Sequence, residues 1–296
     1  MLYNGIEYPV FRASLHNHST TSDGSFTVAE HARFFHDAGY DVFAISDHRI
    51  PNDVSSINIP GLTVISGIEL HPMGPRGILW HILALDVPKD FRGIYDTGKE
   101  AVDAAKAVGA LVYVAHPRWC GLHVEEILEL GELNGIEIDN SGCRLIGRAV
   151  NDEIWDELLD AGARPCHALA TDDSHEWNCF AQGWTMIAAE ENTHDCIMDA
   201  LRKGRFYATQ GPDFHSIEFR DGHFRATFSE AVSAVVVGSR GLGVCGAMPR
   251  WPMPGCEVPP ATSIEADVSS WPKGSWLRCQ ICDANHHYAW TQPFFV

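Results

Sequence analysis

The chain has 296 residues, which suits one large domain or a large and a small one, and its 45% hydrophobic content excludes a disordered chain. The formal charge of −18, with 39 acidic against 21 basic residues, argues against binding extended nucleic acid through a basic surface. No segment reaches the roughly 18 apolar residues of a membrane helix, and the nine cysteines form no disulfide framework. We therefore expect a cytoplasmic protein without a membrane partner.

Strand-like and helix-like segments alternate along the first two thirds of the chain. In the helix 27–39, Thr27 and Glu30 form a capping-box pattern and Gly39 marks the end. The predicted strands are short apolar runs that span 11–16, 41–48, 62–70, 77–86, 110–117, 135–140 and 163–175. Further helices are expected at 96–108, 124–130, 151–162 and 193–204. Apolar strands that alternate with amphipathic helices predict an α/β fold with a mostly parallel sheet, either open or closed into a barrel.

The C-terminal third has a different pattern. From Gly211 onward, short alternating runs are separated by Gly and Pro, and no helical period is found. This pattern predicts a small antiparallel β-sandwich over residues 212–296, after an α/β domain over residues 1–211. The Pro- and Gly-rich segment 246–260 is expected to be a loop.

Histidines and carboxylates gather where the predicted strands end. His16 and His18 share one face of their strand, since side chains alternate with a period of two. Nine residues form the set, each at or beside a strand: His16, His18, Asp23, His48, Glu69, His81, His116, Asp173 and His175. In parallel α/β folds the carboxyl ends of the strands meet at one edge, where ligands bind. Imidazole and carboxylate suit Zn, Mn and Fe, and nine ligands exceed what one ion takes, so two or three divalent metals are expected.

The motifs that carry these residues resemble those of a known family. "HNHSTTSDG", "ISDH", "GIE", "HILAL", "AHP" and "DDSH" are similar to motifs of the polymerase and histidinol phosphatase (PHP) superfamily, over roughly residues 12–211. The resemblance implies a distorted (β/α)7 barrel that holds two or three divalent metals. "GRFYATQGPDFHSI" and "SWLRCQICDANHHYAWTQPFFV" resemble the branch with a small C-terminal β-domain, which includes uncharacterised phosphoesterases and carbaryl-hydrolase-like metallohydrolases.

The resemblance also distributes the nine residues over three metal sites, with Glu69 bridging the first two. The first site would take His16, His18, Glu69 and Asp173, the second Glu69, His81 and His116, and the third Asp23, His48 and His175. Relatives carry His or Asp at the position of Asp23, and a carboxylate there is compatible with a third metal. Asp172, next to the last Asp-x-His pattern, is expected to orient a ligand histidine.

Clustered metals predict a hydrolase. Three divalent ions would bring about six positive charges against about three from Asp23, Glu69 and Asp173, so the pocket favours a phosphate. The expected reaction is in-line attack of a metal-bridging hydroxide on a phosphoester of a small phosphorylated metabolite or nucleotide. These three carboxylates are expected to take part in catalysis. An arginine could assist them, because its guanidinium can bind the phosphate with two hydrogen bonds. The candidates, each of which could instead form a salt bridge at the surface or between domains, are Arg118, Arg144 and Arg205.

Other functions stay open at this point. A metal-dependent carbamate, ester or amide hydrolase would use the same centre, and an apolar, aromatic pocket without an arginine would favour it. A non-catalytic binding module is disfavoured by the complete set of nine candidate ligands. Glu137 and Asn140 could contact substrate or close the sheet, His71 could reach the pocket rim, and Trp119 could stack on a base or sugar or pack in the core. The physiological metal and a homo-oligomeric state are also open.

Overall fold

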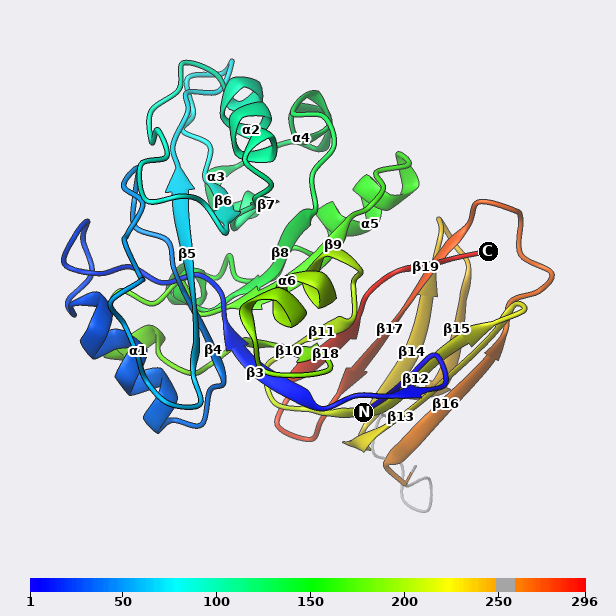
Figure 1. Cartoon of the computed structure of the whole chain (residues 1–296). Coiled ribbons are helices and arrows are strands. Elements are labelled where there is room, and N and C mark those ends of the chain that lie inside the picture. Colours follow the sequence, from blue (N-terminus) through cyan, green and yellow to red (C-terminus); the bar gives the residue numbers. More distant parts are fainter. Residues whose placement is uncertain (249–258) are drawn as a thin grey trace.

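The computed structural model describes residues 1–248 and 259–296. Seven strands follow one another as neighbours, in the order of the sequence, within one large sheet (Figure 1). These strands are β3 (Val10–Ser14), β4 (Val42–Ile45), β5 (Thr63–Leu70), β6 (Ile82–Leu85), β7 (Leu111–Val114), β8 (Gly135–Asn140) and β9 (His167–Thr171). Most of their residues are buried, which explains why they form nearly continuous apolar runs in the sequence.

The row of seven strands closes on itself beyond its first and last members. Asn17, just after β3, forms a parallel bridge with Ser174, just after β9, and the His18 amide donates to the Ser174 carbonyl oxygen at 3.0 Å. The next strand, β10 (Trp184–Ala188), pairs antiparallel with β3, and its Thr185 hydroxyl donates to the Ala170 carbonyl oxygen of β9 at 3.0 Å. The residues that follow β3 and those that follow β9 therefore lie side by side, at the same end of the row of strands.

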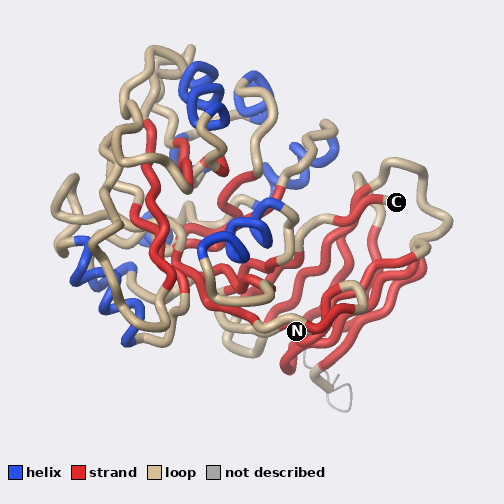
Figure 2. Tube along the Cα trace, viewed as in Figure 1, coloured by secondary structure: helices blue, strands red, loops and turns tan. Residues whose placement is uncertain are grey.

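All the helices of the described chain lie before residue 203, and the C-terminal part consists of strands and loops (Figure 2). They are α1 (Val28–Asp37), α2 (Gly98–Ala107), α3 (Pro117–Cys120), α4 (Val124–Glu129), α5 (Asp152–Asp160) and α6 (His194–Arg202), with 3-10 turns η1 (Gly142–Ile146) and η2 (Trp177–Cys179). The predicted capping box of Thr27 and Glu30 is present at α1. None of the helices in the described ranges is long and apolar enough to cross a membrane.

The alternation of strands and helices is incomplete. In the fully described stretch 42–85, no helix separates β4 from β5 or β5 from β6, and β6 pairs antiparallel with both β5 and β7. The connection between Leu70 and Ile82 holds no crossover helix, and β6 runs back antiparallel along β5. The predicted mixed α/β class is confirmed, while a complete (β/α)7 barrel stays a prediction.

The C-terminal part is antiparallel, as the sequence predicts. Its strands are β11 (Phe206–Thr209), β12 (Phe214–Arg220), β13 (His223–Ala231), β14 (Ser233–Gly238), β15 (Gly243–Ala247), β16 (Ala261–Asp267), β17 (Trp276–Cys282), β18 (Tyr288–Thr291) and β19 (Phe294–Phe295). One buried cluster joins Phe214, Phe224 and Ile264 of one sheet to Val236 and Leu277 of the other. Of the predicted loop 246–260, residues 249–258 lie outside the described residues.

The two parts of the chain share structure across the predicted boundary at residue 211. Strands β1 (Leu2–Tyr3) and β2 (Ile6–Glu7) belong to the five-stranded C-terminal sheet, where β1 pairs with β12. The other C-terminal layer extends the sheet of the first part, because β11 pairs with β10 on one side and with β18 on the other. The independent sandwich and the division 1–211 and 212–296 therefore stay predictions.

Candidate metal centre

The nine predicted ligands meet at the opening where the row of strands closes. Seven of them line one cavity of about 350 Å³: Asp23, His48, Glu69, His81, His116, Asp173 and His175. The other two, His16 and His18, are fully buried beneath it. The direction of β6 explains the place of His81, which comes directly before that strand. Because β6 is antiparallel to β5 and β7, its first residue lies at the edge where those two strands end.

The predicted ligands of the first metal form the buried part of the centre. His16 Nε2 lies 3.6 Å from Glu69 Oε1 and 3.5 Å from Asp173 Oδ1. His18 Nε2 lies 3.6 Å from Glu69 Oε2 and 3.0 Å from Asp173 Oδ1. Two imidazoles and two carboxylates thus face one another within the span of a single coordination sphere.

Glu69 lies between the first group of ligands and the second. Its Oε1 is 2.8 Å from His81 Nδ1 and 3.1 Å from His116 Nε2. The same oxygen lies 3.6 Å from His16 Nε2, and the other oxygen, Oε2, lies 3.6 Å from His18 Nε2 and 2.7 Å from His48 Nδ1. This is the geometry expected of a carboxylate that bridges two cations.

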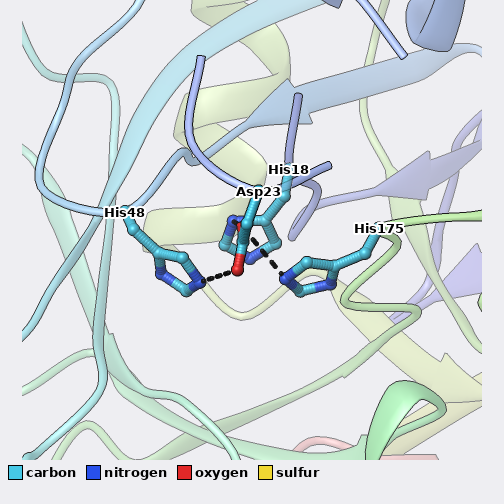
Figure 3. Close-up of side chains that lie close together, drawn as sticks. All are labelled: His18, Asp23, His48 and His175. Atoms are coloured by element: carbon cyan, nitrogen blue, oxygen red, sulfur yellow. Dashed lines mark ion pairs between the residues drawn. The ribbon is translucent and has the colours of Figure 1, made fainter. Parts of the chain in front are cut away.

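The predicted third site lies at the mouth of the cavity (Figure 3). Asp23 places Oδ2 at 3.3 Å from His48 Nε2 and Oδ1 at 3.4 Å from His175 Nε2, and its side chain is 54% exposed. Gly24 allows this position, since a Cβ there would lie 2.3 Å from the His18 carbonyl oxygen. The turn at Gly24 thus brings Asp23 back over His18, which belongs to the buried part of the centre.

Several polar atoms of the centre are buried and make no hydrogen bond in the described chain. They are His16 Nε2, both ring nitrogens of His18, His48 Nδ1 and Asp173 Oδ1. Although carboxylate oxygens lie within 4 Å of the ring nitrogens of His18 and His48, the mutual angles do not suit hydrogen bonding. Buried polar groups are otherwise almost always satisfied. Nitrogen and oxygen atoms that crowd together in this way fit divalent cations of the Zn, Mn or Fe type.

The electrostatics of the centre also suit cations. Burial by itself raises the pKa of the Glu69 carboxyl, but His81 and His16 outweigh it and hold this pKa well below its usual range. Burial likewise disfavours charge on His16, yet Asp173, Glu137 and Glu69 raise its pKa well above the ordinary value. A protonated His16 thus offsets part of the carboxylate charge that divalent cations would offset when bound.

Two predicted ligands adopt backbone conformations that are rare outside glycine. The φ angle is 28° at His116 and 50° at Asp173. Such conformations cost on the order of 1–3 kcal/mol and persist where surrounding contacts impose them. At His116 the backbone N–H donates to Glu137 Oε2 at 2.8 Å, which helps to impose the conformation.

Glu137 and Asn140, left open by the sequence, lie behind the ligands and are fully buried. Glu137 Oε1 lies 2.6 Å from His16 Nδ1 and accepts a hydrogen bond from Thr171. Asn140 donates to Glu137 Oε2 at 2.8 Å and to Asp173 Oδ2 at 3.2 Å. These contacts orient the predicted ligands, as residues behind a metal site do, and leave neither side chain facing the cavity.

Asp172 does not orient a histidine, so that expectation is wrong. Its carboxylate accepts backbone hydrogen bonds from Ala181, Gln182 and Gly183 at 2.7–2.9 Å, and burial raises its pKa to about 6. The residue fixes a loop, because its carboxylate accepts from three consecutive backbone amides of that loop and contacts no imidazole of the described chain.

Two side chains near the centre were not predicted as parts of it, and a third, His71, was expected to reach the pocket rim. Asp47 accepts from Ser19 and Ser22, and so holds the loop that leads to Asp23. His31 Nδ1 lies 3.0 Å from the His18 carbonyl oxygen, beneath the predicted ligands. The third, His71, lies 3.3 Å from Glu69 Oε2. For Asp47 a signal exists in the sequence, namely its position directly before His48.

The structure does not bring the three predicted arginines into the cavity. Arg118 is exposed and absent from the cavity lining. Arg144 pairs with Asp139 at 3.2 Å, and Arg205 pairs with Asp199 at 2.9 Å. For Arg144 and Arg205 the alternative, a salt bridge, therefore describes what the side chain does. No lysine or arginine lines the cavity within residues 1–248 and 259–296.

The fold and the centre together define the class of this protein: it has a PHP-like fold that gathers histidines and carboxylates at the strand ends. The particular likeness is to a two-domain protein from Bacteroides vulgatus that contains a predicted PHP-like metal-dependent phosphoesterase. The TM-score is 0.54 at 14% sequence identity, over 98% of this chain and 95% of that one. The resemblance to the PHP superfamily predicted from the motifs is thereby confirmed for the fold.

Two further solved structures match parts of the chain with TM-scores below 0.5. A proposed metal-dependent phosphoesterase from Bifidobacterium adolescentis matches with a TM-score of 0.45 at 16% identity, over 58% of this chain and 90% of that one. A lesion-specific endonuclease from Pyrococcus furiosus matches with a TM-score of 0.47 at 13% identity, over 66% and 56%. A family model described as a protein of unknown function (DUF3604) matches residues 150–238. No curated protein matches the chain.

Proposed function

We propose that this protein is a metal-dependent phosphoesterase that hydrolyses a phosphoester of a small metabolite or nucleotide. The observation that carries the proposal is the convergence of nine histidines and carboxylates around one cavity, with buried donor atoms that find no hydrogen-bond partner in the described chain. The likeness in fold to a protein with a predicted phosphoesterase domain supports the same reaction class.

In this proposal some side chains of the centre would bind the ions, and others would hold those side chains in place. Divalent cations such as Mn, Zn or Fe would supply Lewis acidity toward a phosphoryl oxygen and acidify a bound water. Glu69 and Asp173 would hold the first two ions with their histidines, and Asp23 would complete a third site. Glu137 would keep His16 in the orientation that binding requires. Because no basic side chain lines the described cavity, a phosphate would find its positive charge on the ions alone.

Phosphate release by protein loaded with Mn or Zn tests the proposal. We would measure it across sugar phosphates, nucleotides and cyclic phosphates, together with the bound metal per chain. Asp173→Asn should remove activity and lower the metal content, because it removes a carboxylate that contacts both His16 and His18. Asp103→Asn, in the exposed pair with Lys99, is the matched control. Full activity in Asp173→Asn, or no phosphate release by fully metallated wild-type protein, would contradict the proposal.

A second reaction is favoured by the walls of the cavity. Trp119 and Leu145 line it, while Arg118, Arg144 and Arg205 do not. We therefore propose hydrolysis of a carbamate or carboxylic ester as the alternative, with the same residues holding the ions. Assay of the metal-loaded protein on carbamates and esters separates the two: activity there without phosphate release in the first panel would favour the alternative.

A further inference from the structure

Trp119 is placed between the predicted metal ligands and solvent. Its ring centroid lies 5.0 Å from that of His81 and 5.2 Å from that of His116. The residue lines the cavity, and 44% of its surface is exposed. The indole therefore packs against two imidazoles of the second predicted site, and the rest of its surface is accessible to a ligand in the cavity.

The position of this indole is fixed by the chain around it. Trp119 belongs to the short helix α3, which follows directly on His116. The backbone N–H of His116 donates to Glu137 Oε2 at 2.8 Å, and the backbone N–H of Arg118 donates to Asn151 Oδ1 at 3.0 Å. Both anchoring side chains are buried, so the backbone that carries Trp119 is held in place, while the ring itself is positioned by its contacts with His81 and His116.

The rest of the cavity mouth supplies apolar surface and negative charge, without positive charge. Leu145 of η1 lines the same cavity and is 70% exposed. Glu176 is the one lining carboxylate of the described chain outside the predicted ligand set. Since no lysine or arginine lines the described cavity, a second anionic group on the substrate would meet the Glu176 carboxylate and find no basic residue outside the predicted ligands to pair with.

We propose that Trp119 determines substrate specificity by stacking on a planar aromatic group carried by the leaving alcohol, and that this group has no further negative charge. The inference rests on the proposed phosphoesterase function and specifies its substrate class. In the reaction, the oxygen of water bonds to phosphorus, and the bond from phosphorus to the alcohol oxygen breaks. The alcohol takes up a proton and inorganic phosphate is released.

The test compares two phosphomonoesters whose leaving alcohols have similar acidity: benzyl phosphate and methyl phosphate. Their difference in kcat/KM then reports binding of the ring rather than chemical reactivity. Metal-loaded full-length protein should prefer benzyl phosphate by about tenfold or more, the size expected when an aromatic pair adds to apolar burial. A third probe, 4-carboxybenzyl phosphate, should be hydrolysed more slowly than benzyl phosphate because it adds a negative charge.

Variants assign the preference to Trp119. Trp119→Ala should bring the ratio of the two kcat/KM values close to one, and Trp119→Phe should keep most of it. Trp177→Ala is the matched control, because Trp177 is 57% exposed, packs on Phe26 and Phe34, and does not line the cavity. Loss of metal in a variant lowers both rates and leaves the ratio unchanged. Titration calorimetry with benzylphosphonate and methylphosphonate, which are not hydrolysed, should reproduce the ratio as binding.

The outcomes separate this inference from the function on which it rests. Hydrolysis of both esters with equal kcat/KM, or a preference that persists in Trp119→Ala, overturns the inference and leaves the phosphoesterase in place. Absence of hydrolysis of every phosphoester by fully metallated protein overturns the proposed function and the inference with it.

Discussion

At the scale of single residues, the centre separates side chains that face the cavity from side chains that hold them. The sequence predicts the first kind well, because histidines and carboxylates placed directly after strands are visible in the order of residues. It does not distinguish Glu137 from a substrate ligand, since both would be polar residues on a strand. Only the contacts of Glu137 with His16 and the His116 backbone assign it to the support of the ligands.

Replacing Glu137 tests this supporting role. Glu137→Gln should weaken metal binding by roughly 10- to 100-fold, the usual effect of losing such a partner, while the fold remains intact. Competition with a chromogenic chelator measures the affinity, and circular dichroism checks the fold. Glu132→Gln, an exposed control in a surface pair with Lys106, should leave the affinity unchanged. Equal affinity in Glu137→Gln and wild type would show that Glu137 has no such role.

At the scale of elements, the direction of β6 matters most for the site. An apolar strand has the same composition whichever way it runs, so the sequence predicts the strand but not its antiparallel pairing. The pairing places His81, which precedes β6, at the same edge as His116, which follows β7. Strand β9 shows a different effect, because it begins with His167, a half-buried residue whose Nδ1 is buried and makes no hydrogen bond in the described chain.

The stability of the fold should depend on pH through His167. Burial lowers its pKa to about 4 in the folded state, against about 6.5 for an unperturbed histidine. The unfolded chain therefore binds a proton below pH 6.5 that the fold rejects, so stability is lost as the pH falls from 6.5 toward 4. The loss would be up to about 3 kcal/mol. Urea unfolding at pH 7.5 and pH 5 measures it.

His167→Gln should show a smaller loss of stability between these two pH values than wild type, because the substituted side chain does not titrate. The metal centre and the other histidines contribute equally to both proteins, so they cancel in the comparison. An equal pH dependence in the two proteins would show that His167 is not kept neutral by burial.

At the scale of the whole molecule, an ion pair between a buried guanidinium and a half-buried carboxylate joins α5 to the C-terminal sheet. Arg278 of β17 is 2% exposed and donates to both carboxylate oxygens of Asp156 at 2.8 and 2.9 Å. The guanidinium also lies over the Trp155 ring at 5.1 Å. Because Arg278 and Asp156 are more than a hundred positions apart in the sequence, local sequence patterns do not predict the pair.

Removing one partner of this pair should destabilise the molecule strongly. Asp156→Asn leaves a buried guanidinium without its counter-charge, which costs about 3–5 kcal/mol. Glu265→Gln breaks the exposed pair with Arg225 and should cost at most about 1 kcal/mol. Denaturant unfolding of both variants gives the comparison. A similar, small effect in the two would mean that Arg278 finds compensation elsewhere.

The sequence by itself determined which residue types reach the strand ends, the mixed α/β class, and the antiparallel character of the C-terminal part, because these follow from local order and periodicity. Tertiary structure decided the rest. The antiparallel direction of β6 and the contact of Glu137 with His16, 121 positions away, exist only in the folded chain. The same holds for the ion pairs that keep Arg144 and Arg205 out of the cavity lining, and for the position of Trp119 in that lining. The physical reason is that hydrogen bonds, ion pairs and burial depend on distances in space, which spacing along the chain does not contain.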